Sequence, residues 1–200
     1  MFENGQRMEK LNVIFANRSI DAYFCNLNQT PLTSSWKSAS DASLQPHTVI
    51  QHLSMGMNAH INLDLGIAAA ETAKGSDIQL IQKDFNLINN IIGCLINIIQ
   101  KDLEEICAPM KLLKYVDNKS KESVVRFSIT AARNTAWANA VGLSVLQKNM
   151  YPGYIKYLDD KINLVASNII NPNFSQSLIL RTVRIFEPKD IGEIIKFLKD

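Results

Sequence analysis

The stretch "HLSMGMNAHINLDLG", residues 52–66, decides the fold because it is long, apolar and almost free of charge. From Ala42 to Ala70, the only Asp, Glu, Lys or Arg residue is Asp64. A helix with no charged face has no side suited to water, so it is expected to be buried on nearly all sides. We therefore expect a central helix over residues 46–74, with Asp64 inside the protein.

The rest of the chain also has the pattern of helices separated by short breaks. Apolar residues recur at alternating spacings of four and three along residues 77–105, which is typical of a helix inside a bundle. Residues 120–149 are rich in Ala, which allows a neighbouring helix to approach closely. Further expected elements are helices over residues 6–27, 154–170, 174–186 and 189–199, and a Ser- and Pro-rich loop over 28–46 with a short helix around Trp36.

This order of elements predicts an all-α fold, an antiparallel helical bundle with additional C-terminal helices. At 200 residues the chain has the length of one domain, so we expect a single helical domain over residues 1–200. The core is expected between the helices at 46–74, 77–105 and 120–149.

The charge pattern argues against polyanionic and membrane partners. The formal net charge is +2, from 21 basic and 19 acidic residues, and the basic residues are scattered rather than gathered in a stripe. We therefore expect no nucleic-acid partner. No window holds 18 uninterrupted apolar residues, so no membrane span is expected. The Cys residues lack CxxC spacing, and charges replace an apolar signal core near the start, which predicts a cytoplasmic protein.

A buried Asp64 needs hydrogen-bond donors, because an unpaired buried carboxylate is strongly unfavourable. The best donor in the sequence is Arg133, in the Ala-rich segment ITAARNTAWANA. A guanidinium can satisfy a carboxylate with two parallel hydrogen bonds, and Trp137 lies one turn away to shield the pair. Asp84 also falls in an apolar row of its helix, so we expect Arg133 to pair with Asp64 or with Asp84.

Polar side chains on neighbouring helices extend this pair into a network at the centre of the bundle. Functional sites tend to gather where buried polar groups meet in a cleft, so the network predicts a pocket that binds a small-molecule ligand or carries out hydrolysis. The expected catalytic residues are His60 as a base, Asp64 to orient it and Arg133 as an anion anchor. The expected binding residues are Asn58, Asn62, Asp84, Asn89 and Trp137.

The HxxxD spacing of His60 and Asp64 also suits a metal. It places the imidazole and the carboxylate about 6 Å apart along one helix face, and Asp84 would add a third ligand. The spacing is similar to the helix motif of the zinc-dependent phospholipase C and single-strand nuclease superfamily. Sites of that superfamily need several more histidines, and His52 lies too far along the helix to join the same ion. The sequence therefore allows at most one divalent metal ion, held by His60, Asp64 and Asp84.

Three segments of the chain, LSMGMNAHINLDLGIAAA, DFNLINNII and ITAARNTAWANA, together resemble an uncharacterised bacterial family, a domain-of-unknown-function group. That family carries a GMNAHIN-x-DL signature and a later Arg-x3-Trp helix. The similarity extends over residues 23–137 and more loosely beyond. The resemblance implies an all-helical fold and implies no activity. It covers both the segment with His60 and Asp64 and the segment with Arg133.

A structural interpretation of the same residues stays open. In it, the protein is a non-enzymatic helical scaffold or interaction protein, and Arg133 neutralises an aspartate within a polar clasp that fixes the helix register. A cavity beside His60 would favour a site, whereas close packing around it would favour the clasp. The sequence names neither the oligomeric state nor the substrate.

Overall fold

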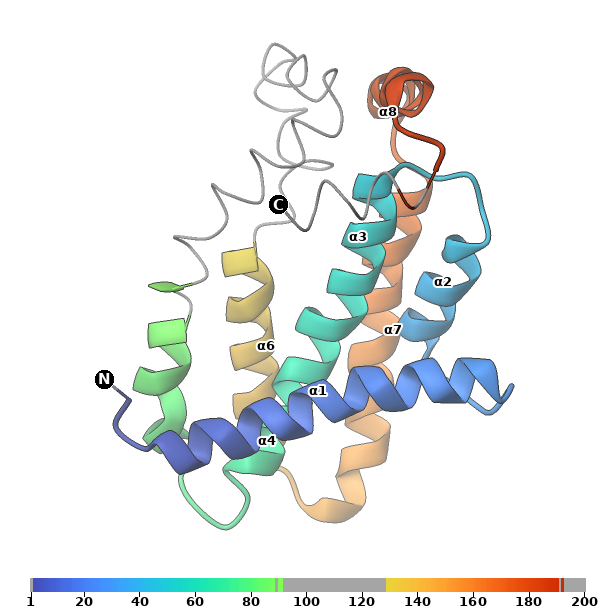
Figure 1. Cartoon of the computed structure of the whole chain (residues 1–200). Coiled ribbons are helices and arrows are strands. Elements are labelled where there is room, and N and C mark those ends of the chain that lie inside the picture. The colour runs from blue at the N-terminus through green and yellow to red at the C-terminus, as the bar shows by residue number, and fades with distance from the viewer. Residues whose placement is uncertain (1, 89, 92–128, 191, 193–200) are drawn as a thin grey trace.

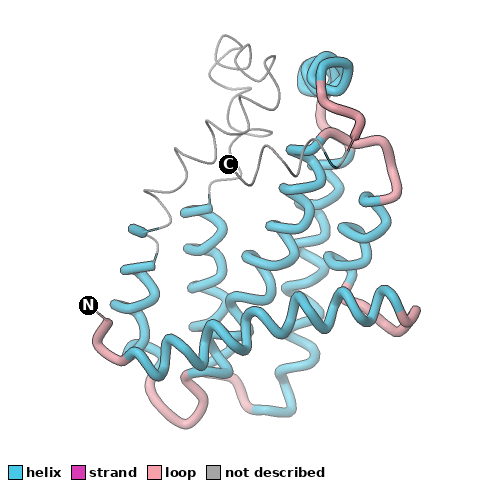
Figure 2. The backbone as a smooth tube through the Cα atoms, in the orientation of Figure 1, coloured by secondary structure: helices cyan, strands magenta, loops and turns pink. Residues whose placement is uncertain are grey.

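The computed structural model describes residues 2–88, 90–91, 129–190 and 192. Every regular element in this part of the chain is a helix, so the fold is all-α, as the sequence predicts (Figure 1, Figure 2). The antiparallel arrangement of the bundle stays a prediction. A search of the described residues finds no helix that is long and apolar enough to cross a membrane.

The central helix predicted over residues 46–74 is present, and its middle is unusual. The segments α3 (Val49–Met57), η1 (Asn58–Asp64) and α4 (Leu65–Thr72) follow one another without a break. The helix begins after Thr48, whose hydroxyl oxygen accepts a hydrogen bond from the Gln51 backbone N–H at 3.3 Å in a capping box. The η1 segment is a π-helix, a form that is rare and frequently occurs at functional sites.

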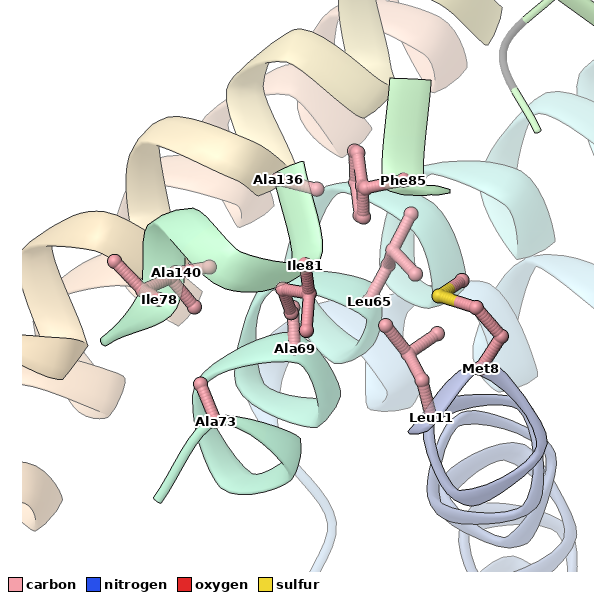
Figure 3. Packing of buried hydrophobic residues seen from close by; sticks show 10 residues of the cluster. All are labelled: Met8, Leu11, Leu65, Ala69, Ala73, Ile78, Ile81, Phe85, Ala136 and Ala140. Atoms are coloured by element: carbon pink, nitrogen blue, oxygen red, sulfur yellow. The ribbon is translucent and has the colours of Figure 1, made fainter. Parts of the chain in front are cut away.

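Two apolar clusters of described residues enclose the second half of the central helix, from Leu63 onward, which explains why this half carries so little charge. The first joins α4 to α1 (Gly5–Leu27), η2 (Ile78–Ile81) and α6 (Ile129–Ser144). Its members, shown in Figure 3, are Met8, Leu11, Leu65, Ala69, Ala73, Ile78, Ile81, Phe85, Ala136 and Ala140. The second joins the central helix to α6 and α7 (Tyr151–Ile170) through Leu63, Ile67, Ala70, Leu143, Leu158 and Ile162.

The α4 and α6 helices approach each other closely because both present small side chains. A Cβ atom on Gly66 would lie 2.8 Å from the Ala136 carbonyl oxygen, so the two backbones are nearly in contact. Ala136 and Ala140 are fully buried. The close approach predicted for the Ala-rich segment is therefore confirmed.

The outer helices pack around the central helix in different directions. α1 lies across the other helices rather than alongside them (Figure 1). α2 (Ser34–Ser43) packs against α7, where Asp159 accepts hydrogen bonds from the backbone N–H groups of Ser34 at 2.6 Å and Ser35 at 2.9 Å. These bonds satisfy donors that the first turn of α2 leaves free. The short η4 (Lys148–Met150) precedes α7, and α8 (Phe174–Phe186) follows it.

The helix boundaries agree with the predicted ones at α1 and α8, whereas α7 begins three residues before the predicted 154 and α6 ends at Ser144 rather than at 149. α1 differs by one residue from the predicted 6–27, and α8 coincides with the predicted 174–186. The short helix expected around Trp36 is α2. The predicted helices at 77–105, 120–149 and 189–199 lie partly outside the described residues, as does Asn89.

Candidate functional site

Asp64 is buried, with 1% of its surface exposed, and connects η1 to α1 and α2. Its Oδ1 accepts a hydrogen bond from Arg18 Nε at 2.9 Å, and its Oδ2 accepts one from Trp36 Nε1 at 2.8 Å. Arg18 belongs to α1 and Trp36 to α2. A guanidinium and an indole N–H thus supply the donors that a buried carboxylate requires.

His60 lies four residues before Asp64, at the edge of the same cluster. Its Nδ1 is 3.6 Å from Asp64 Oδ2, is buried, and has no hydrogen-bond partner among the described residues. The imidazole stacks on the Phe15 ring, with centroids 3.7 Å apart and 4° between the planes, and its centroid is 6.1 Å from that of Trp36. The His60 side chain is 27% exposed, although its Nδ1 atom is buried.

Two amides of the central helix make hydrogen bonds inside the protein. Asn58 donates from Nδ2 to the Ile162 carbonyl oxygen at 3.0 Å, and Asn62 donates from Nδ2 to Asn58 Oδ1 at 2.8 Å. The Asn62 carbonyl oxygen accepts a bond from Asn139 Nδ2 at 3.1 Å. These contacts hold the π-helical segment against α6 and α7. The ligand-binding role of Asn58 and Asn62 stays a prediction.

The predicted pairing of Arg133 with Asp64 or Asp84 is wrong, because another helix, α1, supplies the guanidinium that Asp64 binds. Arg133 is buried on α6 and donates to the Phe85 carbonyl oxygen at 3.4 Å. Its guanidinium carbon lies 4.6 Å from the centre of the Phe85 ring, and the Trp137 ring is centred 5.1 Å from that ring. Burial lowers the pKa of Arg133 to about 10, below its ordinary value.

Asp84 anchors the beginning of α1. Its Oδ1 accepts a hydrogen bond from the Glu3 backbone N–H at 2.7 Å, and its Oδ2 accepts one from the Asn4 backbone N–H at 3.0 Å. Burial alone would raise the pKa of Asp84, but these two bonds and the charges of Arg7 and Lys83 together lower it below the ordinary value. The Asp84 carboxylate therefore holds the backbone at the start of α1, and none of these contacts joins it to the cluster around Asp64.

Asp84→Asn is expected to remove a pH-dependent contribution to stability. Because the folded pKa lies below the unfolded one, the stabilisation is present above the ordinary Asp pKa and is lost as the pH falls through the folded pKa. At neutral pH, we expect the variant's free energy of unfolding to be about 1–2 kcal/mol lower than the wild-type value, because two charge-assisted hydrogen bonds are weakened. Urea unfolding at a series of pH values should show the two proteins converging in acid. The control is Asp41→Asn on the exposed surface, and a difference that stays constant with pH would contradict the prediction.

The three-ligand metal site predicted from His60, Asp64 and Asp84 is also wrong. In the part of the chain that the structure describes, no group of three or more His, Cys, Asp or Glu side chains is arranged to hold a metal ion. Both Asp64 oxygens accept hydrogen bonds from α1 and α2, and Asp84 is bound to the backbone before α1. These residues therefore do not fit the divalent metal ion expected from the sequence.

The sequence predictions missed Arg18 and Phe15, and they used Trp36 only to place a short helix. A signal for Arg18 is nevertheless present. Leu11, Phe15, Arg18 and Ala22 follow one another at spacings of four, three and four along α1, so Arg18 interrupts an apolar row. A cation in such a row needs a buried anion as a partner.

A comparison with known proteins places the chain in a family. A model described as a family of unknown function, DUF5995, matches residues 1–172, which include the whole cluster around Asp64. No curated protein and no solved structure matches the chain. Because the match spans most of its 200 residues, the chain belongs to DUF5995, a family of unknown function.

Proposed function

We propose that the protein binds a small molecule beside His60 and hydrolyses it, with the imidazole as the general base. One observation carries this proposal: His60 is partly exposed, while its Nδ1 is buried and faces a carboxylate 3.6 Å away. In this proposal, Nε2 is the nitrogen that faces the substrate. General-base catalysis by histidine uses such an orienting carboxylate, and the contact often tightens only in the substrate complex.

The chemistry follows from the two ring nitrogens. With the proton on Nδ1 directed at Asp64, Nε2 is free to accept a proton from water. The oxygen of that water then attacks the carbonyl or phosphoryl centre of the substrate, and the imidazolium gives its proton to the leaving group. The Asp64 carboxylate stabilises the positive ring, and its distance from Nδ1 is expected to shorten when substrate binds, as such contacts do in other enzymes.

The residues around His60 suit a ligand with an aromatic or apolar part and a negative oxygen. Phe15 and Trp36 provide aromatic surface next to the imidazole. Asp64 engages Nε of Arg18, whose side chain is 26% exposed, so the terminal nitrogens of this guanidinium can donate to a ligand oxygen. Arg18 thus takes the anion-anchoring role that the sequence analysis assigned to Arg133.

A second candidate function is favoured by the contacts of Asp64. Because this carboxylate binds Arg18 on α1 and Trp36 on α2, it acts as a clasp that joins both helices to the central one. In this alternative, the protein is a non-enzymatic scaffold or interaction protein, and the polar cluster serves only its structure.

The two functions are separated by His60→Gln. We expect wild-type protein to hydrolyse members of a panel of p-nitrophenyl esters and p-nitrophenyl phosphate, and the variant to be slower by about 100-fold or more, because general-base catalysis is worth at least that much. The matched control is His52→Gln, a half-buried histidine on the same helix, which should keep the wild-type rate. Absence of hydrolysis in the wild type, with a loss of stability as the only effect of His60→Gln, would favour the scaffold.

The proposal also includes where the protein acts and on what kind of molecule. We propose that the protein acts in the cytoplasm on a small molecule rather than on nucleic acid, which the scattered basic residues and the Cys content support. We also propose that GMNAHINLDL, residues 56–65, is the signature segment of the bacterial members of this family, because it contains both His60 and Asp64.

A further inference from the structure

A cavity lies outside the cluster around His60. It has a volume of about 610 Å³ and is formed by the first turn of α3, the end of α7 and one face of α8. Figure 1 shows these elements meeting at the end of the molecule opposite the loop that follows α4. The volume falls within the range of sites that bind small molecules.

The charges around this cavity are mainly positive. His47, Arg181 and Arg184 line it. Glu187 is buried and accepts a hydrogen bond from the Val49 backbone N–H at 3.0 Å, and its other oxygen lies 3.5 Å from Arg184 Nη1. Glu187 therefore compensates the charge of Arg184.

Arg181 has no such compensation. It is exposed and makes no ion pair with the described residues. Among the described residues at the cavity, this leaves an excess of about one positive charge at neutral pH, carried by Arg181. This excess suits a ligand with a single negative charge better than one with two.

The neighbouring His52 supports this view of the electrostatics. Its pKa is lowered by burial and by the positive charges of His47 and Arg184. The His47 and His52 rings are centred 5.9 Å apart. The lowered pKa of His52 therefore reflects a positive electrostatic environment at the start of α3, to which Arg184 contributes.

One part of the wall of the cavity is apolar, and polar side chains line the rest. Ile170, Leu180 and Ile185 line it together with Pro46 and Pro172. A ligand that fits both the walls and the charge has an apolar body and one anionic group. We propose that this cavity binds a monocarboxylate with an apolar chain, with the carboxylate on Arg181 and the chain against Leu180 and Ile185.

Isothermal titration calorimetry of the full chain tests this site, with octanoate, octylamine and acetate as probes. We expect octanoate to bind with a ratio of one per chain, and octylamine and acetate to bind at least about tenfold more weakly, since each lacks one recognised feature. Arg181→Gln should weaken octanoate binding by about tenfold, because it removes a charge-assisted contact on an exposed side chain without touching the core.

Two control variants make the result specific. Lys74→Gln removes one positive charge in the exposed loop after α4 and should bind octanoate as the wild type does. His60→Gln should also bind normally, because His60 does not line this cavity, so the outcome is independent of the proposed hydrolysis. The proposal is overturned if octanoate does not bind, if octylamine binds as well as octanoate, or if Arg181→Gln leaves the affinity unchanged.

Discussion

Asp64→Ala is expected to lower the free energy of unfolding by about 3 kcal/mol. The substitution removes a buried carboxylate and leaves the donors of Arg18 and Trp36 without their partner. Breaking a buried ion pair from one side is costly because the remaining charge stays desolvated. The Arg18 side chain is 26% exposed, so water recovers part of the loss, and we place the effect at the lower end of the usual range.

Urea unfolding followed by Trp fluorescence measures this effect. Asp160→Ala is the matched control, because Asp160 also accepts from a basic side chain, Lys156 at 3.1 Å, but on the exposed surface. That variant should lose less than about 0.5 kcal/mol. Equal losses in the two variants would contradict the view that Asp64 is a buried clasp between α1, α2 and the central helix.

Gly66→Ala is expected to destabilise the protein by about 2–3 kcal/mol, although Ala normally favours a helix over Gly. The new Cβ would lie 2.8 Å from the Ala136 carbonyl oxygen and 3.1 Å from the Asn139 Cβ. A backbone oxygen cannot rotate away as a flexible side chain can, so α4 and α6 must move apart. Their separation would weaken the apolar cluster that both helices share.

Gly56→Ala, in the same central helix, is expected to have the opposite effect on stability. A Cβ at this position would meet nothing within 4 Å, so only the helix preference remains. We expect this variant to be more stable than wild type by about 0.5–1 kcal/mol. Thermal unfolding of both variants should therefore shift in opposite directions, and a Gly66→Ala protein as stable as wild type would show that the two helices are not in close contact.

Much of the fold could be predicted from local patterns. The lack of charge between Ala42 and Ala70 predicted the buried central helix, and the small residues near Ala136 predicted a close helix approach. The close approach is confirmed, and so is the burial from Asn62 to Ala70, whereas one side of α3 is half-buried and Leu53 is exposed. The confirmed parts depend on properties that each segment carries by itself. The π-helical form of η1 was not predicted, because the residues of that segment are compatible with an α-helix as well.

For the candidate site too, some features could be predicted from the sequence and others could not. By itself, the sequence determined that Asp64 is buried, that His60 lies one turn from it, and that a donor must come from elsewhere in the chain. Only the tertiary structure decided that this donor is Arg18 with Trp36, whereas Arg133 packs on Phe85 and Asp84 anchors the start of α1. The physical reason is that α1 crosses the other helices, and a crossing direction depends on the packing of all the faces together rather than on the periodicity of any one of them.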